Sequence, residues 1–270
     1  MTRLERTQRL VLATALFVAF VGMLWECPPV TQLPFPKGLS AWIDMAPLTQ
    51  PIPRYSIDAL VGVLLVLWAL RKGEVVIPIF VVLLTFFLSF IEEGFHATTA
   101  DVSQGKSMPF AAWIAYVIGS QFVRPTVDRP DAERNGREMA AGTVAAGYTM
   151  AGLSKVFRDG ASWFDGRSMA MMIAERADEW PDPIHSIRVF MTFHPGLCAA
   201  GMGFALVVEL CGLTYLKREW RFRYAFATFL MHSGIRLLLG YFHIDWWSNM
   251  VTIAWWSTSK TEAERAVGDP

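Results

Sequence analysis

The chain has 270 residues, of which 53% are hydrophobic and 18% are charged. Its 24 basic and 24 acidic residues give a formal net charge of zero, so no overall field favours nucleic acid as a partner. Such a composition, with 11 Trp and 19 Phe, argues against an ordinary soluble protein and indicates the lipid bilayer as the main partner.

Eight apolar segments are compared with the roughly 20 residues that a helix needs to cross the hydrocarbon core. They cover residues 9–26, 56–71, 75–92, 108–124, 138–157, 188–215, 223–243 and 246–257, and the last is the shortest. Charged or proline-rich breaks separate most of them. The pattern predicts an all-α, polytopic transmembrane bundle of about eight spans, forming a single domain over residues 1–270.

Two breaks between the spans are expected to lie outside the membrane, on its outer side. Residues 27–55 carry seven prolines and no long apolar run, which predicts an outer loop. Residues 158–187 mix acidic and basic residues with a Met-rich apolar stretch, which is typical of an amphipathic helix on a membrane surface.

Basic residues gather in the breaks that an eight-span topology places on one side of the membrane. The main ones are Arg3, Arg6, Arg9, Arg71, Lys72, Arg124, Arg129, Arg134, Arg137, Lys217, Arg218, Arg221, Arg223, Lys260 and Arg265. Because cytoplasmic loops carry an excess of Lys and Arg, both termini are expected in the cytoplasm. The sequence therefore predicts a multi-pass protein of the plasma (inner) membrane.

Ionisable side chains within the spans are functional candidates, since they are expensive to bury in lipid. Lys155 shares one helix face with Gly152 and Tyr148, at the outer end of the fifth predicted span. In a low-dielectric environment desolvation favours the neutral amine, which could act as a base. The alternative is that Lys155 extends its ammonium to the outer interface.

A second group of candidates lies on the sixth and seventh spans. His232 and Arg236 are four residues apart and could bind an anionic or quinone-like head group. Alternatively they form a structural pair, bonded to Glu209 or to backbone carbonyls on other helices. His194 precedes Pro195, which favours a capping or hydrogen-bonding role. On the predicted topology most of these groups lie in the outer half of the membrane, and Glu209 lies near the inner end of span six.

The sequence contains no convincing metal signature. Its five histidines are scattered, with no His-x-x-x-His or Cys-x-x-Cys spacing. Glu92, Glu93 and His96 could offer oxygen and nitrogen ligands at one helix end, but this spacing is weak evidence. No metal site is predicted.

The stretch Tyr148-Thr-Met-Ala-Gly-Leu-Ser-Lys155, followed by Trp163-Phe-Asp-Gly-Arg-Ser-Met169, resembles the vitamin K-dependent γ-carboxylase and its bacterial relatives in the HTTM (horizontally transferred transmembrane) family. The resemblance implies that Lys155 is the base that starts oxidation of a quinol, with a quinone or quinol as the cofactor. The gap between the two halves is about three residues longer than in the animal enzyme. No counterpart of the family's other catalytic histidine is found, and only a short segment follows the last span, so γ-glutamyl carboxylation itself is not expected.

Two hypotheses follow. In the first, Lys155 is the catalytic base at the outer membrane face, and Tyr148, Trp163, His194, His232 and Arg236 contribute to binding a quinol-like ligand. In the second, the chain is a non-catalytic subunit that packs against a larger membrane complex through its small-residue spans and its Trp-rich C-terminal region. A transporter would predict an internal repeat of span patterns, and none is found.

Overall fold

The computed structural model describes residues 3–25, 27–95, 104–122, 129–158, 160–175, 184–239 and Ala254, and every regular element in these ranges is a helix. This confirms the all-α class. Where the sequence predicts one domain, the contacts within the chain fall into two compact units. Unit 1 comprises Met1–Ala140 and Ser248–Pro270, and unit 2 comprises Ala141–Trp247.

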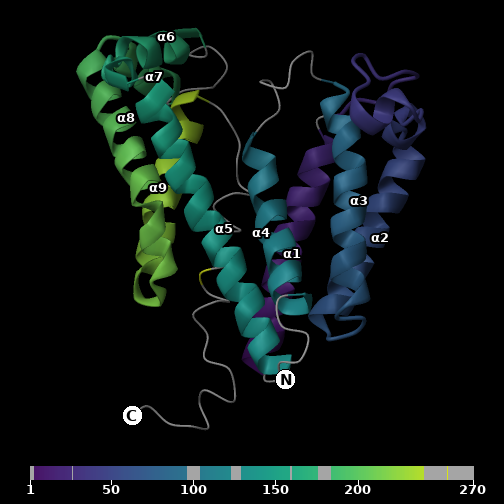
Figure 1. Ribbon diagram of the computed structural model, residues 1–270. Coiled ribbons are helices and arrows are strands. Elements are labelled where there is room, and N and C mark those ends of the chain that lie inside the picture. Colours follow the sequence, from purple (N-terminus) through teal and green to yellow (C-terminus); the bar gives the residue numbers. More distant parts are fainter. Residues whose placement is uncertain are drawn as a thin grey trace, which may run out of the picture. The chain divides into compact units, whose positions relative to one another are not determined.

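The described part of unit 1 contains four α-helices and the first part of a fifth (Figure 1). They are α1 (Arg3–Trp25), α2 (Pro51–Ala69), α3 (Val76–Glu93), α4 (Gln104–Gln121) and the start of α5 (Arg129–Arg158). Helix α1 packs against α2, α3 and α4. Helix α2 starts five residues before the predicted span, because Pro51 sits in its first turn, where a missing N–H leaves no hydrogen bond unmade.

The proline-rich segment before α2 contains two short 3-10 helices, η1 (Gly38–Ala41) and η2 (Ala46–Thr49). Between α2 and α3 the chain turns at Arg71 and Gly73, whose φ angles of 62° and 59° lie in the left-handed region. Glycine adopts this region without strain, whereas Arg71 does so at some energetic expense.

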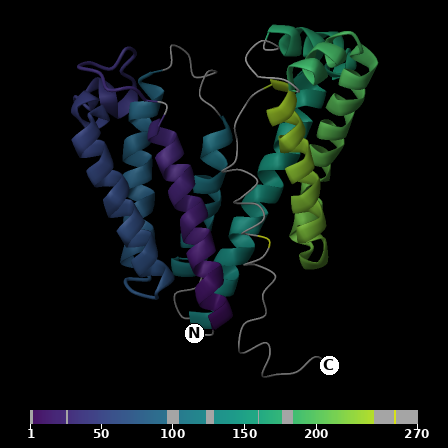
Figure 2. The same ribbon diagram turned by 180° about the vertical axis from the view of Figure 1, so that it is seen from behind.

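Unit 2 contains the rest of α5 and the elements that follow it (Figure 2). These are η4 (Gly160–Phe164), α6 (Arg167–Glu175), α7 (Ile184–Thr192), α8 (Pro195–Leu210), η6 (Cys211–Leu216), η7 (Arg218–Trp220) and α9 (Arg221–Leu239). Helices α8 and α9 pack side by side, and the short α6 and α7 lie at the end where α8 begins (Figure 1). Helix α6 is amphipathic, with Ala170 and Ile173 buried and Met171 exposed.

The predicted continuous span 188–215 is wrong. Helix α7 ends at Thr192, and α8 starts afresh at Pro195 after a break at His194, whose φ of −126° and ψ of 65° are not helical. Proline cannot donate a backbone hydrogen bond, so it starts a helix more readily than it continues one. The predicted eighth span, 246–257, lies outside the described residues except for Ala254.

Glycine permits close contact of α5 with α8 and η6 at two positions. A Cβ atom on Gly152 would lie 2.9 Å from the backbone nitrogen of Leu210, and one on Gly212 would lie 2.7 Å from the carbonyl oxygen of Ala145. By contrast, a Cβ on Gly142 or Gly201 would meet nothing within 4 Å. Only some of the small residues in these helices therefore serve close packing.

The described part of the chain contains two helical segments long and apolar enough to cross a membrane, α2 (Pro51–Ala69) and the stretch Pro195–Leu216 formed by α8 and η6. The apolar helices Val76–Ile91 and Phe110–Gln121 are shorter. Only 22% and 33%, respectively, of the two longer segments is buried inside the structure. Large apolar side chains are exposed along α2, α3, α8 and α9, among them Val63, Val66, Leu83, Phe86, Phe204, Val207, Phe226 and Leu230.

Candidate functional site

An ion pair between Lys155 and Glu209 joins α5 to α8. The Nζ atom of Lys155 lies 2.7 Å from Oε1 and 2.6 Å from Oε2 of Glu209. The side chains are 23% and 11% exposed, respectively. Both carboxylate oxygens are therefore bonded to one ammonium group in a site with little access to solvent.

Gly152 and Trp163 shape the surroundings of this ion pair. Gly152 lies one turn before Lys155, and a Cβ there would come within 3.1 Å of the Cβ of Glu209, so its absence lets α5 approach α8. The indole ring of Trp163, in η4, has its centroid 5.2 Å from Nζ of Lys155, within range of a cation–π interaction. Its Nε1 donates a hydrogen bond to the carbonyl of Met202.

The opposite depths predicted for Lys155 and Glu209 are incompatible with their contact. The sequence places Lys155 at the outer end of its span and Glu209 near the inner end of the next, yet the two side chains are in contact. Glu209 follows Pro195 by 14 residues, which corresponds to about 21 Å along α8. Helix α5 ends partway along α8, and the chain continues beside α8 as η4 before it reaches α6. The end of α5 is therefore not the end of the bundle.

Tyr148 and His232 form a second buried polar pair. The Tyr148 hydroxyl lies 2.8 Å from Nε2 of His232, and both residues are buried. The ring of Tyr148 packs edge-on against that of Tyr224, whose hydroxyl donates to the carbonyl of Val208. Tyr148 precedes Lys155 by seven residues, about 10 Å along the helix. The structure thus joins Tyr148 to His232 but places both away from the ammonium of Lys155.

The other two candidates are not brought to Lys155. His194 is exposed at the start of α8, makes no side-chain cap bond, stacks on Phe190 and has Nδ1 2.7 Å from the Phe190 carbonyl oxygen. Its predicted hydrogen bonding is therefore observed, and its capping is not. Arg236 lies one turn beyond His232 on α9 and is half-buried. Arg188, a residue that the sequence analysis overlooks, is fully buried in α7 and donates to the carbonyl of Leu237.

Unit 1 contains an ion-pair cluster that the sequence analysis also misses. Nη1 of Arg9 lies 2.9 Å from Oε1 of Glu133 and 3.4 Å from Oε1 of Glu74. Its Nη2 donates to the Trp68 carbonyl at 2.8 Å, and the guanidinium lies 4.3 Å from the centroid of the Trp68 ring. Arg9 and Arg71 serve in the sequence analysis only as markers of the inner side. The signal for more was present, since an arginine at the first position of an apolar span requires a partner if it is buried.

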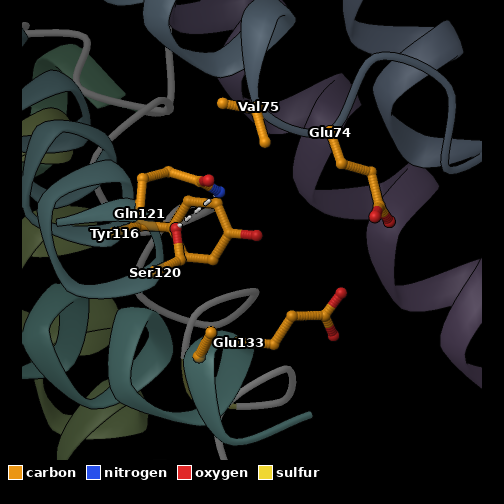
Figure 3. A pocket seen from close by; sticks show the side chains of 7 residues that line it. Glu74, Val75, Tyr116, Ser120, Gln121 and Glu133 are labelled. Carbon is orange, nitrogen blue, oxygen red and sulfur yellow. Dashed lines mark hydrogen bonds between the residues drawn. The ribbon is translucent and has the colours of Figure 1, made fainter. Parts of the chain in front are cut away.

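A cavity of about 240 Å³ lies beside this cluster (Figure 3). We call it the Glu74–Glu133 cavity. It is lined by Glu74, Val75, Tyr116, Ser120, Gln121, Ala132 and Glu133. In Figure 3 the Tyr116 hydroxyl points to the same side as the two carboxylates, and the amide of Gln121 donates to the Ser120 hydroxyl at 3.3 Å.

Within the described ranges, no three His, Cys, Asp or Glu side chains are grouped so that they could hold a metal ion. The side chains of Glu92 and Glu93, and all of His96, lie outside the described residues. Comparison of the chain with protein-family models, curated proteins and solved structures gives no match. The resemblance to the γ-carboxylase and HTTM proteins therefore stays a prediction from the sequence.

Proposed function

We propose that this chain is a multi-pass protein of the plasma (inner) membrane, similar to the HTTM and γ-carboxylase proteins, that binds a quinol-like lipophilic ligand beside Lys155. Lys155 acts as the base that removes a proton from the ligand. The observation that carries the proposal is the ion pair of Lys155 and Glu209, which is largely shielded from solvent and whose lysine ends the stretch that resembles the family's motif.

The exposed faces of the helices support the membrane location. Most of α2 and of Pro195–Leu216 is exposed, whereas the core helices of a soluble protein are mostly buried. Soluble monomers rarely expose large contiguous apolar patches. Lipid is the environment in which such faces are stable, and the remaining apolar helices complete the polytopic bundle.

The chemistry of the ion pair supports a role for Lys155 as a base. When the ligand hydroxyl approaches, the ammonium of Lys155 passes a proton to the Glu209 carboxylate, whose Oε2 lies 2.6 Å from Nζ. The neutral amine then accepts the proton of a quinol hydroxyl and leaves a quinolate, while Glu209 keeps the first proton. Lys155 is thus the proposed base, and Glu209 is the group that makes the free amine available.

Trp163 provides a surface suited to an aromatic ligand. Its ring lies beside the Lys155 ammonium, and a flat quinol ring stacked on it would bring a hydroxyl near Nζ. We propose that Tyr148 and His232 orient the adjoining part of α5 instead of contacting the ligand ring, because they are bonded to each other farther along the helix.

The decisive test uses the full chain in lipid nanodiscs, with menadiol as the probe and dissolved dioxygen as the electron acceptor. The readouts are menadiol binding and the rate of menadiol oxidation above that of empty nanodiscs. Lys155→Met should abolish oxidation, and Lys155→Met combined with Glu209→Gln should fold as the wild type does and remain inactive. The exposed Arg158→Ala, one turn beyond Lys155, is the matched control and should retain activity. Wild-type oxidation by the folded double variant would defeat the proposal.

The alternative is a non-catalytic subunit, in which the same ion pair only joins α5 to α8. The exposed aromatic side chains of α8 and α9, Phe204, Phe222 and Phe226, favour it, since they could face protein as well as lipid. Purification in mild detergent separates the two proposals. A stoichiometric partner together with absence of menadiol binding would favour the subunit.

A further inference from the structure

The Glu74–Glu133 cavity lies in unit 1 and plays no part in the function proposed for unit 2. Its polar lining consists of two carboxylates, a phenol, a hydroxyl and a side-chain amide. An ionised carboxylate can only accept hydrogen bonds, and no basic side chain is among the lining residues. The cavity therefore favours a group that donates hydrogen bonds and carries positive charge.

The two arginines beside the cavity hold Glu133 with different strength, whereas Glu74 has only long contacts, 3.4 Å from Arg9 and 3.7 Å from Arg71. Arg9 is 2% exposed and is fixed both by Glu133 at 2.9 Å and by the Trp68 carbonyl at 2.8 Å. Nη1 of Arg71 lies 3.5 Å from Glu133 and 3.7 Å from Glu74, and this side chain is 33% exposed. Contacts of that length are weak, so Arg71 can leave the carboxylates for solvent at little expense.

We propose that the Glu74–Glu133 cavity binds a primary ammonium group, which takes the place of Arg71 beside the two carboxylates. An ammonium has three donors and no acceptor, which matches carboxylate oxygens from Glu74 and Glu133 together with the Tyr116 oxygen. Because the cation replaces Arg71, the balance of two positive and two negative charges is kept. Arg9 stays in place, and its positive charge reduces the repulsion between the two carboxylates.

The size of the cavity restricts the ligand. A volume of about 240 Å³ is below the ~300–1,000 Å³ of sites for drug-sized molecules. The occupant is a small amine or the head group of a lipid whose acyl chains stay outside. Both sources offer the same primary ammonium group, and the experiment distinguishes them.

The test measures binding of ethanolamine hydrochloride to the full chain in detergent micelles, by calorimetry and by the shift in Tm. Ethylene glycol, which lacks the ammonium, and sodium chloride at equal ionic strength are the controls. Ethanolamine should raise the Tm of the wild type more than either control does. A variant that gains or loses one charge-assisted hydrogen bond to the ammonium should differ from the wild type by about tenfold or more in Kd for ethanolamine.

Two variants should shift affinity in opposite directions. Arg71→Gln removes the competing cation and should tighten ethanolamine binding about tenfold, whereas Glu133→Gln, which retains an oxygen for Arg9, should weaken it about tenfold. Glu138→Gln, on the same helix but not lining the cavity, should bind as the wild type does. Equal affinity in the wild type, Arg71→Gln and Glu133→Gln, or no effect beyond the controls, would overturn the proposal.

Nanodiscs of two lipid compositions distinguish a lipid head group from a free amine as the source of the ammonium. If the site holds a lipid head group, phosphatidylethanolamine should raise the Tm relative to phosphatidylcholine, and this difference should disappear in Glu133→Gln. If the site holds only a free amine, ethanolamine should bind equally in both lipids, with no lipid-dependent difference. Either result is consistent with the ammonium site, and menadiol oxidation by unit 2 is scored separately.

Discussion

Both units contain acidic and basic side chains paired away from solvent, but the two arrangements differ in the cation. In unit 1, Arg9 contacts two carboxylates, a backbone carbonyl and an aromatic ring. In unit 2, Lys155 contacts the single carboxylate Glu209 and the ring of Trp163. The planar guanidinium has five donors and stays charged, whereas an ammonium in an apolar site can give up its proton. The comparison teaches that the arginine cluster is suited to holding several helices together, whereas the lysine pair is the arrangement on which the proposed proton transfer depends.

The largest expected effect is the loss of the Arg9 guanidinium. Arg9→Met leaves Glu74 and Glu133 buried without their main cation and should cost about 3–5 kcal/mol of stability. Chemical denaturation in mixed micelles measures the free energy of unfolding. Arg6→Met, an exposed position on the same helix, is the control and should change it by less than about 0.5 kcal/mol. A loss at Arg9 no larger than at Arg6 would contradict the structural role of the cluster.

The second expected effect concerns the lysine pair. Lys155→Met should cost about 2–3 kcal/mol, less than Arg9→Met, because the pair retains some exposure and orphans only one carboxylate. Adding Glu209→Gln should restore most of that loss, since the remaining groups are neutral. The free energies of unfolding of both variants and of Glu209→Gln alone form a double-mutant cycle. Additive effects would mean that the two side chains are not coupled.

A third change tests the close approach that makes the lysine pair possible. Gly152→Ala should destabilise unit 2 by about 1–3 kcal/mol, because its Cβ would press on the backbone of Leu210. Gly142→Ala, in the same helix but facing open space, should be neutral or stabilising by up to about 1 kcal/mol. The Tm should therefore fall in Gly152→Ala and stay the same or rise in Gly142→Ala, and an equal fall in both would speak against the contact.

The smallest expected effect is at Tyr148. Tyr148→Phe removes the hydrogen bond to His232 and should cost about 1 kcal/mol. The exposed Tyr55→Phe serves as the control, with no measurable change in the free energy of unfolding. Menadiol oxidation should persist in both variants if Tyr148 and His232 orient the helix without touching the ligand. Complete loss of oxidation in folded Tyr148→Phe would instead place Tyr148 at the reacting group.

The sequence by itself determined the all-α class and the approximate places of most helices. Apolar composition and the length of each apolar run are local properties, and local propensity together with proline positions decides where helices begin. It also singled out Lys155, His232 and Arg236, since each is an ionisable residue in an apolar segment. The predicted count of about eight spans is not confirmed. Among the described residues, two segments have the length and hydropathy needed to cross a membrane, and the other apolar helices are shorter.

Only the tertiary structure decided which charges meet. The break before Pro195 and the end of α5 partway along α8 bring Lys155 to Glu209, 54 residues away in the chain. Arg9 and Glu133 are 124 residues apart and meet for the same kind of reason. Partner choice depends on the relative height and rotation of packed helices, and neither quantity is encoded in a short stretch of sequence. A charged residue in an apolar helix indicates that a partner is needed, and the packing of helices distant in sequence determines which residue is that partner.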